Sequence, residues 1–77
     1  MTQALDLASA PLDTPLTLVS VDGVAAHRQR LSTLGLREGA TFRLITRTIG
    51  GGRIALVAGS RIALGSDLVR QLRAKLA

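Results

Sequence analysis

The sequence predicts a mainly β (small α+β) domain, built as a small and partly open barrel of five short strands with one helix inserted after the first strand. Short segments of alternating apolar and polar residues recur along the 77 residues, as half-buried strands do. Turn-forming glycines separate these segments, and one segment has helical spacing. Because Phe42 is the only aromatic residue, the core must consist of aliphatic side chains.

A lead-in segment precedes the first strand. Pro11 and Pro15 interrupt any regular element there, because proline lacks the backbone donor that helices and sheets use. Residues 1–14 are therefore expected to form an ordered lead-in, in which Leu5 and Leu7 cover the core.

The first strand is predicted at residues 16–21, which read LTLVSV. Alternation divides this strand between two faces, one with Leu16, Leu18 and Ser20 and the other with Thr17, Val19 and Val21. An Asp-Gly turn then leads into the predicted helix at residues 24–34.

The helix is expected to pack on the barrel and to stop abruptly. Its spacing places four residues on one side: Val24, His27, Leu31 and Leu34. Gly35 is expected to end the helix in the left-handed conformation, with Leu36 folding back beside it. Gly39 marks a second turn, after which β-rich sequence begins.

Three further strands are predicted at residues 41–49, 53–58 and 61–64. In the first of these, Phe42 and Leu44 share a face. The connecting turns are predicted at Gly50-Gly51-Gly52 and at Gly59-Ser60.

The C-terminal end allows two interpretations. Ser66 is expected to cap one helical turn at residues 67–70. Residues 72–76 alternate and predict a closing fifth strand, which we favour because a sheet of this kind needs its edge paired. In the other interpretation the helix continues, since leucines at positions 68, 72 and 76 are four residues apart.

The composition excludes several classes of protein. Without cysteine the chain has no disulfide and no thiolate metal site. The longest apolar run, residues 54–58, is far shorter than the roughly 18 residues that a membrane span requires. The N-terminal stretch lacks the positive start and the continuous apolar segment of a signal peptide. We therefore expect a cytoplasmic protein that is not inserted into a membrane.

The sequence also argues against catalysis. It contains no P-loop and no nucleophile elbow, and its five carboxylates are scattered. His27 is the single histidine and a weak candidate for a metal ligand, because no Cys, His or carboxylate cluster accompanies it. We expect no enzyme, no catalytic residues, no metal site and no cofactor.

The charge balance favours acidic partners, because ten Lys and Arg against five Asp and Glu give a net charge of +5. Six arginines could merge into one basic face: Arg28, Arg30, Arg43, Arg47, Arg53 and Arg61. Barrels that bind nucleic acid usually add aromatic stacking residues, and this chain has neither Tyr nor Trp. Nucleic acid is therefore not the expected partner and is kept as an alternative.

Two motifs together resemble the FeoA family, the small ferrous iron transport protein A. Arg30-Leu31 followed by Leu34-Gly35-Leu36 and Gly39 is similar to that family's helix-to-strand signature. Residues 57–64, VAGSRIAL, look like its second signature, a glycine-centred hairpin that leads to an Ala-Leu pair. One departure is Glu38, which stands where the family often has proline.

The resemblance implies a single FeoA-like domain over residues 1–77, with an SH3-like barrel core at residues 15–77. It implies a cytosolic accessory role in bacterial ferrous iron uptake and iron homeostasis and, at the level of the family, transition metal ion binding. The implied partner is FeoB, a membrane transporter with a cytoplasmic GTPase domain. An alternative role is that of a regulatory SH3-like module in an iron-responsive system. A monomer or a weak homo-oligomer is expected.

Candidate partner-binding residues are exposed positions near the first signature and at the hairpin. They are Arg28, Arg30, Arg37 and Arg61, with Leu36 as an apolar anchor. Leu36 has a second interpretation as a core residue, which the sequence favours.

Overall fold

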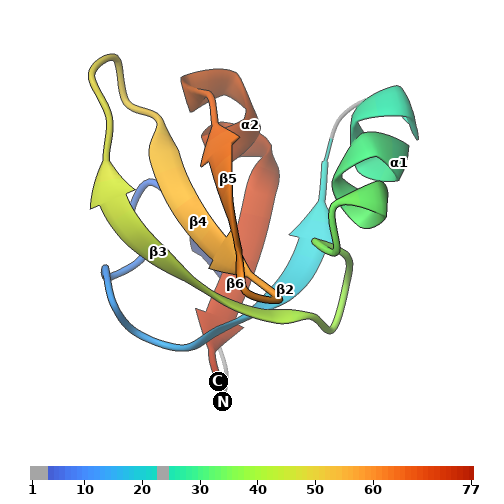
Figure 1. Ribbon diagram of the computed structural model, residues 1–77, viewed down its shortest axis with the longest axis horizontal. Helices are drawn as coiled ribbons and strands as arrows, with labels where there is room; N and C mark the ends of the chain where they lie inside the picture. Colours follow the sequence, from blue (N-terminus) through green and yellow to red (C-terminus); the bar gives the residue numbers. More distant parts are fainter. Residues whose placement is uncertain (1–3, 23–24) are drawn as a thin grey trace.

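In the part of the chain that the structure describes, alternation of aliphatic and polar residues gives a six-stranded antiparallel sheet, curled into a small barrel and accompanied by two short helices (Figure 1). The computed structural model describes residues 4–22 and 25–77. The strand order is β1-β6-β2-β3-β4-β5. The elements are β1 Leu5–Asp6, β2 Leu16–Val21, α1 Ala25–Thr33, β3 Thr41–Arg47, β4 Arg53–Val57, β5 Ser60–Leu64, α2 Ser66–Gln71 and β6 Leu72–Leu76.

The predicted fold class is confirmed, and the five predicted strands correspond to β2 through β6. The sequence missed β1, because a two-residue strand carries no periodic signal. It pairs with β6 through Leu5 opposite Ala74 and Asp6 opposite Arg73. Leu7, directly after β1, is fully buried, so this leucine does cover the core as expected.

Strand β2 contains a bulge that changes which residues face the core. Leu16 and Leu18 share a buried face, in agreement with the predicted alternation, but Val21 is buried as well and Ser20 is only half-buried. The pairing with β6 shifts between Leu18 and Ser20. A bulge adds one residue to one strand, so every later side chain changes face. The predicted faces of Ser20 and Val21 were therefore wrong.

The core is aliphatic apart from Phe42, which is buried with Leu44 on the inner face of β3 as predicted. Across three neighbouring strands, Leu44, Ala55 and Ile62 form one row of paired positions on this inner face. Cross-strand neighbours of this kind are the unit of packing in a sheet.

Helix α1 stands beside the barrel instead of lying flat on it (Figure 1). Of the residues predicted for its apolar side, only Leu31 is buried, whereas His27 is exposed and Leu34 is 45% exposed. Val24 lies outside the described residues. The prediction that a broad face of this helix packs on the barrel was wrong. Only Leu31, in the last turn, is buried, and the chain leaves the helix directly after that turn. The helix is therefore attached to the barrel at its C-terminal end.

The end of α1 is a Schellman motif, as Gly35 predicted. The Leu36 amide donates to the Leu31 carbonyl oxygen at 2.9 Å, and the Gly35 amide donates to Ser32 at 3.0 Å. Gly35 has a φ of 95°, which glycine adopts without steric cost. Leu31 and Leu36 are both buried, as the apolar pair of this motif usually is.

The C-terminal segment is a helix followed by a strand. Strand β6 pairs with β1 on one side and with β2 on the other, which confirms the favoured interpretation and excludes a continued helix. The helix cap differs from the prediction: Gly65 is the N-cap of α2, and Ser66 is its first residue and makes no capping hydrogen bond.

Two glycine-containing turns connect the hairpins. The triple glycine joins β3 to β4 as predicted, and the Thr48 amide donates to the Gly52 carbonyl oxygen at 3.0 Å. The β4–β5 turn consists of Ala58 and Gly59 instead of Gly59-Ser60, because Val57 and Ser60 already pair across the two strands. Ala58 and Gly59 have φ values of 50° and 82°, so the turn is of the primed type that fits the strand twist.

Ala58→Asn is expected to stabilise the domain. A left-handed residue costs L-alanine roughly 1–2 kcal/mol, and Asn tolerates this conformation and is preferred before Gly in such turns. We expect the free energy of unfolding to rise by about 0.5–1 kcal/mol in urea titrations. A decrease would show that the turn does not impose this conformation in solution.

Arg53 is the one buried charged residue in the described part of the chain. Its guanidinium donates to the carbonyl oxygens of Gly51, Gly52 and Ala8 at 3.1, 2.8 and 3.1 Å. The Arg53 side chain therefore joins the glycine turn to the lead-in segment. Its role is structural, and it does not belong to a basic surface.

Candidate functional site

The candidate surface surrounds helix α1 and extends to strand β5. Arg28, Arg30, Arg37 and Arg61 are all exposed. Leu36 is fully buried. Its interpretation as a core residue is therefore confirmed, and it offers no apolar anchor at the surface of the folded domain.

The first of two grooves beside α1 lies between this helix and β5, and we name it the α1–β5 groove. It has a volume of about 230 Å³. Its lining is mainly apolar, with His27 and Arg30 on the helix as the exceptions: His27, Arg30, Leu31, Leu34, Ile62, Ala63, Leu64 and Leu68. The groove exists because the helix is attached through Leu31 and leaves Leu34 only half covered.

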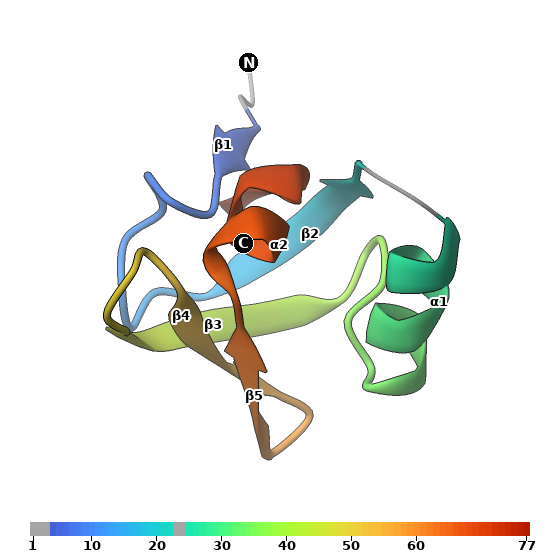
Figure 2. The ribbon, with the colours of Figure 1, turned by 90° about the horizontal axis from the view of Figure 1, so that it is seen from above.

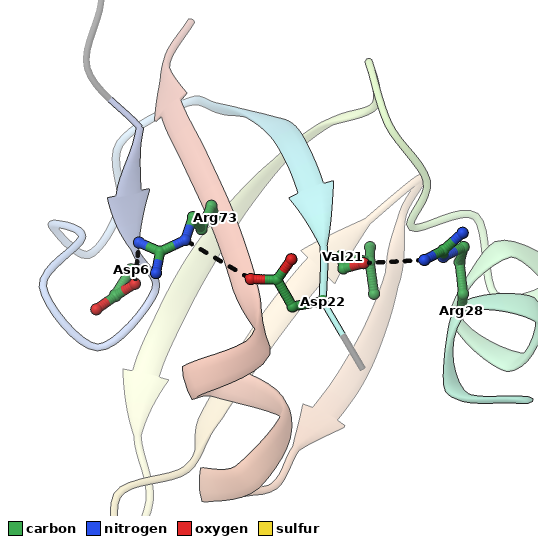
Figure 3. Close-up of polar contacts among 5 residues, drawn as sticks. All are labelled: Asp6, Val21, Asp22, Arg28 and Arg73. Carbon is green, nitrogen blue, oxygen red and sulfur yellow. Dashed lines mark hydrogen bonds and ion pairs between the residues drawn. The ribbon is translucent and has the colours of Figure 1, made fainter. Parts of the chain in front are cut away.

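The second groove lies on the opposite side of α1, toward the end of β2, and has a volume of about 360 Å³. Arg28 and Arg37 line it together with Glu38. The Arg28 guanidinium lies 3.5 Å from the Val21 carbonyl oxygen, which orients it toward the end of β2 (Figure 3). The helix therefore separates the predicted residues, with Arg30 at one groove and Arg28 and Arg37 at the other.

Arg61 lies on the outer face of β5. Its neighbour Ile62 points to the core, so alternation turns the Arg61 side chain away from the barrel interior. Arg61 therefore flanks the α1–β5 groove without lining it. The four predicted arginines are therefore distributed over both grooves and the outer face of β5.

The acidic residues are largely occupied within the domain. Arg73 pairs with Asp6 at 2.6 Å and with Asp22 at 3.8 Å, which joins β6 to β1 and to the end of β2 (Figure 3). Arg70 pairs with Asp67 within α2. Six arginines, all exposed, form no ion pair within residues 4–22 and 25–77: Arg28, Arg30, Arg37, Arg43, Arg47 and Arg61. These positive charges remain available for an acidic partner.

The described residues contain no preformed metal site, because no group of three or more His, Cys, Asp and Glu side chains lies together among them. His27 is exposed at the α1–β5 groove, away from any such cluster. Neither helix of the described segments is long and apolar enough to cross a membrane.

Sequence reasoning missed most of the α1–β5 groove. It assigned His27 and Leu34 to the packed side of the helix, and it gave Ile62, Ala63 and Leu68 no part in a surface groove. The helical spacing of His27, Leu31 and Leu34 was visible in the sequence. The position of β5 at the edge of the sheet was not, because strand order depends on long-range pairing.

The comparison with protein families agrees with this architecture. The model of the FeoA domain matches residues 5–76. The chain belongs to the FeoA family. A crystal structure of an iron uptake regulatory protein (FeoA) is similar at 25% identity with a TM-score of 0.84, covering 97% of this chain and 100% of that one.

Other solved structures share the SH3-like fold of this FeoA domain. The FeoA protein from Chlorobium tepidum is 19% identical with a TM-score of 0.84, covering 94% of this chain and 70% of that one. The structure of ScaR with bound Zn²⁺ is 22% identical with a TM-score of 0.82, and the match covers 95% of this chain and 37% of that one. No curated protein matches the sequence.

Proposed function

We propose that this FeoA domain is a non-enzymatic cytosolic accessory protein of bacterial ferrous iron uptake, which binds and modulates the FeoB transporter through its cytoplasmic part. Membership of the FeoA family supports the role in iron transport. The observation that carries the binding role is the set of exposed arginines without ion pairs around α1 and β5. An interaction surface accounts for them better than a reaction site, since the described residues contain no group of three or more His, Cys, Asp and Glu side chains.

The expected contact combines charge and apolar area. Arg30 stands at the edge of a groove whose floor includes Leu31, Leu34 and Ile62. Charges at the rim of an interface speed association, and apolar contacts in its centre supply affinity. An acidic surface of the transporter with apolar side chains at its centre fits this arrangement.

Arg30→Glu is expected to weaken binding to the purified cytoplasmic part of FeoB from the same organism. Reversal of a rim charge replaces attraction by repulsion, so we expect an increase in Kd of about tenfold at low salt and a smaller one at high salt. Calorimetry at two salt concentrations measures both values.

Arg47→Glu is the matched control, because it changes the net charge equally at an exposed position on β3, away from both grooves. An equal loss of affinity for FeoB in both variants would indicate only long-range electrostatic attraction and no specific contact at Arg30. Absence of binding with and without nucleotide would contradict the proposed contact. Unchanged iron uptake in cells that lack this protein would contradict the accessory role.

Nucleic-acid binding is the second candidate function, and the same exposed arginines support it. It predicts affinity for RNA that falls steeply with salt, since each neutralised phosphate releases counterions. The same calorimetric assay with single-stranded RNA separates the two functions.

A further inference from the structure

Strand β5 has a free edge within the described structure. It lies at the end of the strand order and pairs with β4 alone (Figure 2). Because Val57 and Ser60 close a two-residue turn, they form a hydrogen-bonded pair. Alternation along an antiparallel ladder then directs the backbone N–H and C=O groups of Arg61 and Ala63 away from β4. Unpaired groups of this kind form a template for a further strand.

The α1–β5 groove runs along this free edge. Ile62, Ala63 and Leu64 of β5 line it on one side, and Leu31 and Leu34 line it on the other. Adjacent strands lie about 4.7–4.9 Å apart, so a strand added to β5 would enter the groove. Its side chains on the Ile62 face would meet the apolar lining, and those on the opposite face would lie beside Arg61.

The charges indicate what kind of strand fits. Arg30 lines the helical side of the groove, and Arg61 flanks the strand on its outer face. Neither arginine has an acidic partner among residues 4–22 and 25–77. A second copy of this chain would bring the same arginines and a further net charge of +5, which disfavours edge-to-edge pairing of two copies.

We propose that the free edge of β5 and the α1–β5 groove bind an extended segment of a partner protein by strand addition, with apolar residues alternating with Asp or Glu. Main-chain hydrogen bonds to Arg61 and Ala63 provide affinity, and the groove and the arginines select the side chains. The assignment of this segment to the cytoplasmic part of FeoB rests on the function proposed above. The binding edge itself is testable without the transporter.

A blocked peptide of alternating valine and glutamate is the probe, titrated into the full chain and followed by amide NMR. We expect saturable shifts at residues 61–64 and at the helical side of the groove. With the peptide at about ten times its Kd, exchange of the Arg61 and Ala63 amide hydrogens should slow by roughly tenfold. The same peptide N-methylated at every residue should lose binding, because neither of its two edges can then donate hydrogen bonds.

Protein variants test the side-chain part of the inference. Arg61→Glu and Leu34→Ala should each raise the Kd of the peptide by about five- to tenfold, through lost charge pairing and lost apolar contact. Arg47→Glu should leave it within about twofold, because Arg47 lies on β3 and outside the groove. Amide spectra of each variant establish that the fold is retained.

Three results would overturn the inference: no saturable binding of the alternating peptide, shifts that lie away from β5, or equal binding of the N-methylated peptide. The proposed function can fail separately. If FeoB binds, but neither Arg61→Glu nor an excess of peptide weakens that binding, the transporter does not bind by strand addition and the accessory role stands. If the peptide binds at β5 and FeoB does not bind, the edge is supported and the proposed partner is wrong.

Discussion

Replacement of Leu36 by alanine is expected to lower the free energy of unfolding by about 3 kcal/mol. Leu36 is fully buried and packs at the point where α1 ends. Its amide closes the Schellman motif onto the Leu31 carbonyl oxygen at 2.9 Å. Truncation removes apolar contacts and leaves a cavity beside Leu31, the one buried side chain of the helix. Loss of this packing therefore weakens both the core and the attachment of α1.

Urea unfolding followed by circular dichroism measures this effect. A domain of 77 residues has a total stability of about 4–12 kcal/mol, so the expected loss is a large share of it. The corresponding decrease in Tm is roughly 12–24 °C.

Leu34→Ala is the matched control, since Leu34 is 45% exposed two residues earlier in the chain. Its cost is expected to stay below about 1 kcal/mol, because most of the removed area already faces solvent. Equal losses in the two variants would contradict the different burial of the two leucines. A weakened interaction of Leu36→Ala with a partner would reflect unfolding, so Leu34 and Arg30 are the appropriate probes of the surface.

Gly52→Ala is expected to destabilise the domain by about 3 kcal/mol, for a different reason. Gly52 is buried directly before β4. A Cβ atom there would lie 2.5 Å from the Thr48 Oγ1 and 2.7 Å from the Leu64 carbonyl oxygen. The threonine side chain can rotate, but the backbone oxygen belongs to β5 and moves only if the sheet moves. The glycine turn and the ends of β4 and β5 would have to separate.

Gly65→Ala provides the control for this substitution. A Cβ atom at Gly65 meets nothing within 4 Å, and its φ of −67° suits alanine. Alanine is a poorer N-cap than glycine, which destabilises the domain, but it also lowers the entropy of the unfolded chain, which stabilises the domain. Because these effects oppose each other, we expect the free energy of unfolding to change by no more than about 0.5 kcal/mol. Thermal unfolding of the two variants side by side measures the difference. A neutral Gly52→Ala would show that this turn relaxes more easily than its contacts indicate.

The sequence predicted the local elements well because their signals are local. Gly35 followed by Leu36 determined where α1 ends, since only the left-handed conformation allows both hydrogen bonds of the motif. Phe42 and Leu44 identified the inner face of β3 by simple alternation. Where the prediction failed, the cause was non-local. Val21 was assigned to the wrong face because a bulge depends on the register with β6.

The candidate site was only partly predictable for the same reason. Exposure of Arg28, Arg30, Arg37 and Arg61 follows from their charge, because burying an unpaired charge is costly. Arg53 shows the limit of that rule: three carbonyl oxygens, one from the lead-in segment, hold its guanidinium in the interior. No pattern in the sequence placed Ala8 next to the glycine turn.

By itself the sequence determined which segments form the five longer strands and which form the two helices. It also determined the aliphatic core, the family and the excess of positive charge. Those properties depend on residue composition, on periods of two and 3.6 residues, and on short motifs. Only the tertiary structure decided that β5 is an edge, that α1 is attached through Leu31, and that an apolar groove lies between them. These features arise from pairing and packing between segments far apart in the chain, and no local pattern encodes which strand is left without a neighbour.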